Sequence, residues 1–66
     1  MSIDYAHPYQ IECAEPGMAW TPRPPPFQGD AVAIQIAKQM QLRLPGKAWR
    51  VRNLNSDEVI WLKESS

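Results

Sequence analysis

The chain has few of the residues that build catalytic, metal-binding or disulfide sites. Its 66 residues include one cysteine, Cys13, and one histidine, His7. A lone cysteine excludes an intrachain disulfide, and two soft ligands are too few for a tetrahedral metal site, which takes four. A catalytic cysteine needs a neighbouring base, and an extended chain would place His7 roughly 20 Å from Cys13. We therefore expect no enzyme activity, no metal and no cofactor, with Cys13 as a small buried apolar side chain.

Long hydrophobic runs are also missing. No segment approaches the roughly 18 apolar residues that are needed to span a bilayer, and residues 1–5 carry no basic charge of the kind that opens a secretion signal. A single unpaired cysteine is typical of a reducing compartment. We expect a cytoplasmic protein that makes no contact with a membrane.

Prolines are common, and they are concentrated in residues 15–29. Because proline fixes φ and donates no backbone hydrogen bond, this stretch fits neither a helix nor a central strand. We predict an ordered polyproline II loop over residues 15–29, held to the domain by Trp20 and Phe27. In a second interpretation, Pro22 and Pro25 have the spacing of a proline-rich ligand for an aromatic groove.

A helix over residues 31–44 is the clearest element of the sequence. Asp30 suits the N-cap position, and Pro45 with the glycine after it stops the helix. At about 100° per residue, one arc of about 140° holds the apolar residues Val32, Ala33, Ile36, Ala37, Met40 and Leu44. Ile34 and Leu42 point toward the polar side and mark a second, minor contact face.

Three segments have the pattern of strands. Residues 9–14 and 48–54 place apolar side chains on one face and polar side chains on the other. Residues 55–57 read Asn-Ser-Asp, which is typical of a turn, so residues 58–63 form the second strand of a hairpin. Because this strand is apolar on both faces, we expect it in the middle of the sheet, or beneath a cover supplied by the proline segment or by a partner.

These elements predict a single α+β domain over residues 1–66, with residues 1–8 as a mobile N-terminus. A helix has to bury its apolar arc, and a two-stranded sheet is marginal alone. We expect two layers, one helix on a three-stranded, mostly antiparallel sheet, in the order β-α-β-β. The predicted core consists of Tyr9, Ile11, Ile36, Met40, Trp49, Val51 and either Val59 or Ile60.

Surplus aromatic residues indicate a binding surface. Three tryptophans are many for so small a core, and tryptophan and arginine dominate the energetic centres of protein interfaces. We expect Trp20 and Trp61 to contact a partner protein or a homodimer mate. The first hypothesis is a small non-catalytic interaction module that acts as a regulator, inhibitor or accessory subunit. Proteins of this size are common in phages and mobile elements, where many inhibit a host complex.

The second hypothesis, nucleic-acid binding, is based on the basic residues in the middle of the chain. No acidic residue occurs between Ala31 and Ser56, although the net charge is zero. Guanidinium forks suit phosphate and carboxylate groups, so a nucleic-acid-binding patch is the alternative function. Its members would be Arg43, Lys47, Arg50 and Arg52. The opposing interpretation is that Arg50 and Arg52 pair across the sheet with Glu12 or Glu58.

Overall fold

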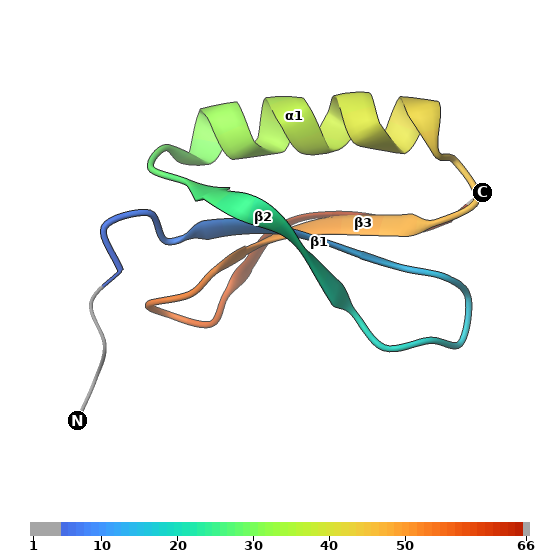
Figure 1. Ribbon diagram of the computed structural model, residues 1–66, viewed down its shortest axis with the longest axis horizontal. Coiled ribbons are helices and arrows are strands. Elements are labelled where there is room, and N and C mark those ends of the chain that lie inside the picture. The colour runs from blue at the N-terminus through green and yellow to red at the C-terminus, as the bar shows by residue number, and fades with distance from the viewer. Residues whose placement is uncertain (1–4, 66) are drawn as a thin grey trace.

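The computed structural model describes residues 5–65 as one helix packed on a four-stranded sheet (Figure 1). The sheet has the order β2-β1-β3-β4, with antiparallel neighbours throughout. The two-layer α+β architecture is confirmed. The expected three strands in the order β-α-β-β are wrong, because the chain order is β-β-α-β-β. The elements are β1 (Tyr9–Ala14), β2 (Thr21–Phe27), α1 (Asp30–Arg43), β3 (Ala48–Asn53) and β4 (Val59–Lys63).

The strand missing from the prediction is β2, which lies inside the stretch 15–29 that we expected to be a loop. It occupies an edge of the sheet, where only one side of the strand has to exchange hydrogen bonds, and proline is tolerated at such an edge. Phe27 pairs with Tyr9 and Arg23 with Ile11, with an irregularity between the two pairs. The prolines thus prevent this segment from forming a central strand, but they allow it to form an edge strand.

A tight turn joins β1 to the segment that leads into β2. Pro16 and Gly17 form its corner, and the amide of Met18 donates a hydrogen bond to the carbonyl of Glu15 at 2.9 Å. Gly17 has a φ of 77°, a left-handed conformation that glycine adopts at no steric cost. A Pro-Gly pair is a strong local signal for such a turn.

Helix α1 begins and ends one residue before the predicted bounds of 31–44. Gly29 is the N-cap and Asp30 is already helical, so the predicted capping role of Asp30 is wrong. Its carboxylate accepts a hydrogen bond from the amide of Ala31 at 2.7 Å and complements the positive end of the helix dipole. Leu44 is the C-cap and is exposed, although the predicted arc would bury it. No helix in residues 5–65 is long and apolar enough to cross a membrane.

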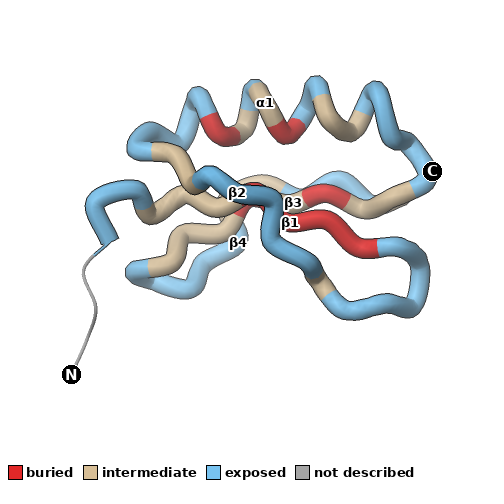
Figure 2. The backbone as a smooth tube through the Cα atoms, viewed as in Figure 1, coloured by how far each residue is buried: buried red, intermediate tan, exposed pale blue. Residues whose placement is uncertain are grey.

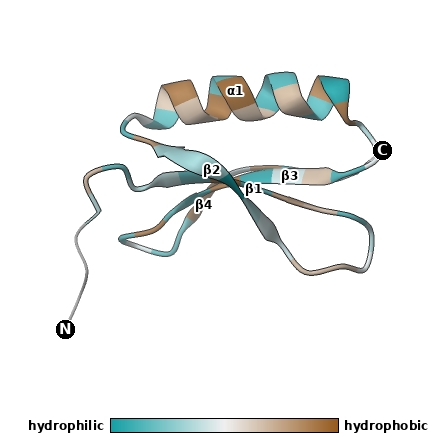
Figure 3. Ribbon diagram, viewed as in Figure 1, coloured by the Kyte–Doolittle hydropathy of each residue, from teal (hydrophilic) through white to brown (hydrophobic). Residues whose placement is uncertain are grey.

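The helix contacts the sheet through small residues. Ala33 and Ala37, which lie one turn apart on the same face, are completely buried. Val32 was expected on this face and is 54% exposed, whereas Ile34 was expected on the polar side and packs against the core. The buried face is therefore rotated from the predicted one. Leu42 is 77% exposed, as predicted, and Figure 3 shows hydrophobic residues distributed along α1.

The core lies between α1 and strands β1 and β3, where Figure 2 shows the buried segments. Trp49 and Val51 are its largest fully buried side chains, and Ile11 and Cys13 lie beside them, as predicted. The indole nitrogen of Trp49 donates a hydrogen bond to the carbonyl of Leu44 at 3.1 Å, which ties the end of the helix to the sheet. The margin of the core holds partly buried side chains, among them Tyr9, Ile36, Met40 and Ile60.

Strand β4 lies at the second edge of the sheet, not in its middle. A bulge inserts Ile60 between Val59 and Trp61, so Ile60 and Trp61 both pack against the core beneath α1. Val59 and Leu62 point to the other side of the sheet and are 43% and 50% exposed. Ile60 thus takes the core position, and nothing in residues 5–65 covers the second face of β4 as we had expected.

The predicted mobile N-terminus, residues 1–8, lies partly outside the described residues. Tyr5 exchanges two hydrogen bonds with the side chain of Asn55, donating its amide at 2.8 Å and accepting with its carbonyl at 3.2 Å. The amide of Leu54 donates to the carbonyl of Pro8 at 2.8 Å. Residues 5–8 therefore lie against the turn between β3 and β4.

The close contact between α1 and the sheet predicts that enlarging a buried alanine destabilises the fold. We expect Ala37→Leu to lower the free energy of unfolding by about 1–3 kcal/mol, because added atoms have to displace the packed core. Ala31→Leu, on the exposed side of the same helix, is the matched control and should change stability by less than about 0.5 kcal/mol. Urea unfolding followed by circular dichroism measures both, and equal stabilities would contradict the described packing.

Candidate functional site

The side of the sheet that faces away from α1 carries no covering element in residues 5–65 (Figure 1). Side chains alternate along a strand, so the residues between the core positions of β1 and β3 point to this side. The loop before β2 adds Trp20, and β4 adds its two exposed apolar side chains. We call this surface the open face, and it consists of Gln10, Glu12, Ala14, Trp20, Ala48, Arg50, Arg52, Val59 and Leu62.

A buried carboxylate lies at the centre of the open face. Glu12 is 4% exposed, although the alternation of β1 had predicted a solvated position. The antiparallel register places it opposite Arg50, whose Nε lies 2.6 Å from Glu12 Oε1. Arg52 Nη2 lies 3.1 Å from Oε2, and the amide of Gln10 donates to the same oxygen at 2.8 Å. The side chains around Glu12 replace the water that a lone carboxylate would require.

Both arginines also contact a residue other than Glu12, and we call the whole set of contacts the network. The guanidinium of Arg50 stacks on the indole of Trp20, with its carbon 4.3 Å from the ring centroid, in the geometry of a cation–π contact. Arg52 Nη1 donates to Asp57 Oδ1 at 2.5 Å. The ion pairs thus join β1 and β3 to Trp20 on one side and to the hairpin turn on the other.

The surroundings of Glu12 keep it ionised. Burial by itself raises the pKa of this carboxyl group, but hydrogen bonds from Arg50 and Gln10 and the charges of both guanidiniums outweigh burial, so the net pKa lies below its ordinary value. The hydrogen bond to Asp57 and the charge of Glu12 raise the pKa of Arg52 in return. A carboxylate with a lowered pKa is poorly suited to proton transfer near neutral pH, and Glu12 serves to hold the two guanidiniums in place.

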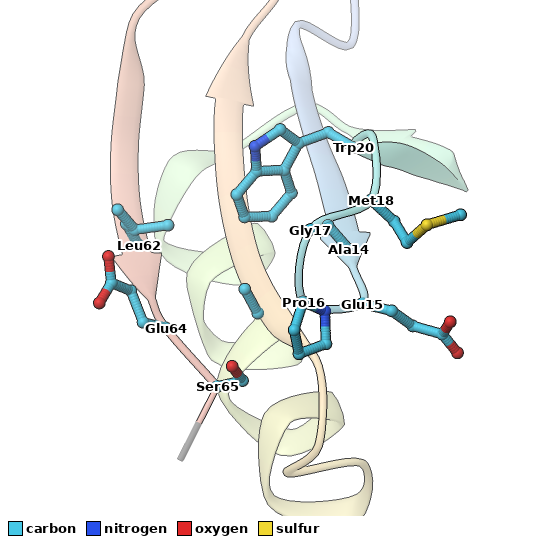
Figure 4. A pocket seen from close by; sticks show the side chains of 10 residues that line it. Ala14, Glu15, Pro16, Gly17, Met18, Trp20, Leu62, Glu64 and Ser65 are labelled. Atoms are coloured by element: carbon cyan, nitrogen blue, oxygen red, sulfur yellow. The ribbon is translucent and has the colours of Figure 1, made fainter.

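A hollow of about 290 Å³ opens beside this network, between the Pro16–Gly17 turn and the end of β4. Figure 4 shows the indole of Trp20 and the side chain of Leu62 over the strands, with Pro16 at the lower rim. Glu15 and Glu64 also belong to its lining, and Figure 4 shows their carboxylates at the periphery, pointing outward. The hollow therefore combines apolar walls with an acidic rim.

The structure separates the residues that the sequence analysis had grouped. Arg50 and Arg52 share the open face, as predicted, and pair with Glu12 as the opposing interpretation held. Arg43 and Lys47 lie near the end of α1 around a second depression, which shares Glu15 and Pro16 with the hollow. Neither of these two depressions is lined by all four bases.

Only one of the two tryptophans named from the sequence lies on the open face. Trp20 stacks there on Arg50, whereas Trp61 packs against the core on the helix side. Sequence reasoning missed Glu64 of the hollow, and it included Leu62 only as part of one face of residues 59–62 that could serve as an interface. The signal for Leu62 was present, because an apolar residue among Val59–Leu62 that could not enter the core had to remain on the other face.

The described residues give little material for chemistry. Cys13 is buried in the core, as expected, and His7 is exposed. Within residues 5–65, no group of three or more His, Cys, Asp or Glu side chains is placed to hold a metal ion. What the open face can do chemically is present a fixed indole, two guanidiniums and a hollow of mixed polar and apolar lining to another molecule.

Removing the charge of Glu12 tests the network. We expect Glu12→Gln to lower the free energy of unfolding by roughly 3 kcal/mol at neutral pH, because two guanidiniums lose their buried partner. Glu15→Gln, at an exposed position on the turn, is the control and should stay within about 0.5 kcal/mol of the parent. Urea titrations of the three proteins measure the difference. A Glu12→Gln variant as stable as the control would show that the network does not couple the strands.

The lowered pKa of Glu12 also predicts a pH dependence of stability. Above the ordinary value of 4.5 the carboxylate is charged in both states, and its stabilising contribution is fully present. As the pH falls through the lower pKa of the folded state, the folded carboxylate becomes protonated and this contribution is lost. We therefore expect the free energy of unfolding to decline below pH 4.5, and to decline less steeply in Glu12→Gln. Parallel slopes for the two proteins would assign the acid sensitivity to other carboxylates.

Comparison with known proteins provides no relative from which a function could be transferred. No family model matches the chain, and no curated protein or solved structure matches it. The case for a function therefore depends on the geometry of the open face.

Proposed function

We propose that this chain is a small, non-catalytic interaction module that binds a partner protein through the open face. The observation that carries the proposal is a set of apolar side chains on the open face, a side of the sheet that no helix or strand of residues 5–65 covers. Val59 and Leu62 are 43% and 50% exposed, and the half-buried indole of Trp20 lines the hollow together with Leu62. Exposed apolar groups that adjoin one another favour an interface. An arginine stacked on a tryptophan is the pairing of residue types that dominates interface energies.

The network beneath this surface supports the proposal, because it fixes the surface before binding. Glu12 holds Arg50 at 2.6 Å, and Arg50 lies against Trp20. Side chains that are already ordered lose less conformational entropy when a partner docks. A preorganised indole and guanidinium can therefore contribute to affinity in a small interface.

The lining of the hollow indicates what the partner presents. Apolar walls from Pro16 and Leu62 accept an aliphatic or aromatic side chain, and the carboxylates of Glu15 and Glu64 favour a lysine or arginine next to it. The partner that we propose is a protein that presents an apolar side chain flanked by basic residues, and we expect to find it in the cytoplasm. By occupying that surface, the module would act as a regulator, inhibitor or accessory subunit.

The two other interpretations have less support. Arg50 and Arg52 are neutralised by Glu12 and Asp57, which leaves little positive charge for a phosphate backbone. Arg43 and Lys47 line the second depression without the other two bases, so nucleic-acid binding remains a prediction. The proline-rich segment is paired with β1 as strand β2, which commits one of its sides to the fold.

Two matched charge insertions test the proposal. We expect the chain that carries Leu62→Glu, a substitution on the open face, to recover no partner in affinity capture from an extract of the source cells. Leu42→Glu, on the outer side of α1, should retain the partner because both leucines are exposed but only Leu62 lines the hollow. Titration with the purified partner should show at least about a tenfold weaker affinity for Leu62→Glu, equivalent to about 1.4 kcal/mol. Equal affinities for the two variants would overturn the assignment of the open face.

A further inference from the structure

The two edges of the sheet differ in their capacity to accept another strand. Edge strand β2 contains Pro22, Pro24, Pro25 and Pro26, which have no backbone N–H to donate. Edge strand β4 contains no proline, and its sequence Val-Ile-Trp-Leu-Lys is predominantly apolar. Natural sheets usually protect an edge with proline, charge or a covering element. In residues 5–65, β2 has such protection, and β4 carries only Lys63 and a bulge.

The bulge gives β4 an unusual order of faces. Ile60 and Trp61 both point toward α1, whereas Val59 and Leu62 point to the open face. Lys63 pairs with Trp49 and so lies on the helix side. Residues 59 and 62 therefore point to the open face, and residues 60 and 61 between them point to the helix side. This pattern is the same when the strand is read in either direction.

The flanking charges extend this symmetry. The carbonyl of Glu58 accepts a hydrogen bond from the amide of Asn53 at 2.7 Å, which places Glu58 across from Asn53 on the helix side. Glu58, which directly precedes β4, and Lys63, the last residue of β4, thus lie on the same face and carry opposite charges. In a second copy that runs antiparallel, Glu58 of each chain lies opposite Lys63 of the other.

We propose that β4 pairs with β4 of a second copy of this chain, antiparallel and about a two-fold axis between Ile60 and Trp61. Val59 then lies opposite Leu62 of the other copy, which joins the two open faces into one continuous surface. Opposite charges at directly facing positions stabilise cross-strand pairs, and like charges destabilise them. The β4 edge is complementary to a strand that has the same pattern of faces and the opposite order of charges. An antiparallel copy of β4 from a second chain is such a strand.

A charge exchange tests the pairing. Glu58→Lys and Lys63→Glu each place like charges opposite one another at both ends of the interface, whereas the double variant Glu58→Lys/Lys63→Glu restores opposite charges. We expect sedimentation equilibrium of the purified full chain to show dimers, with the dissociation constant raised roughly tenfold in each single variant and restored to within about threefold in the double variant. Both side chains are exposed, so circular dichroism should show folded protein in every case.

Three results would overturn the pairing. They are a parent chain that stays monomeric up to about 1 mM, a double variant no better than the single variants, and assembly beyond two chains. Amide hydrogen exchange gives an independent readout, because protection in β4 should rise with protein concentration while protection in β2 stays constant. This inference does not rest on the proposed function. The purified chain alone decides the dimer, and affinity for a partner decides the role of the open face.

Discussion

The carboxylate of Glu12 is the point on which the exposed side of this sheet depends. A single helix can cover one face, and the central strands β1 and β3 must protect their other face with their own side chains. Glu12 does so by engaging Arg50 and Arg52, which in turn reach Trp20 and Asp57. Buried ion pairs often contribute little net stability compared with apolar packing. The value of this one lies in fixing where an indole and two guanidiniums stand.

On the face of the sheet that packs against α1, the contacts depend on the sizes of apolar side chains and not on ion pairs. Ala33 and Ala37 allow α1 to approach the sheet, and the large side chain of Trp49 fills the space between them and β1. The indole also supplies a donor to the carbonyl of Leu44 at the C-terminal end of α1, where helix carbonyls lack partners. The two layers are therefore joined by packing along the helix and by a hydrogen bond at its end.

Local patterns predicted the local elements, and they failed where position in the sheet mattered. The turn at Pro16–Gly17, the helix and the hairpin follow from residue chemistry within a few positions, and all three are present. Whether a strand is central or at an edge depends on long-range pairing. The sequence analysis therefore predicted a loop where the edge strand β2 lies, and a central or covered position for β4, which lies at the other edge. The burial of Glu12 was missed for a related reason, since its cover comes from Arg50, which is 38 positions away in sequence. The open face could thus be predicted in part, from the alternation around Arg50 and Arg52, but the hollow could not.

The proline-bearing strand β2 has a consequence for how far any association of this sheet can extend. A sheet with two receptive edges can add copies without limit and grow into filaments of stacked strands. A sheet with one sealed edge is exhausted once its single receptive edge is occupied, and the product is a closed pair. Because β2 is an edge strand with four prolines, an association of the proposed kind would end at two chains instead of growing into a fibre.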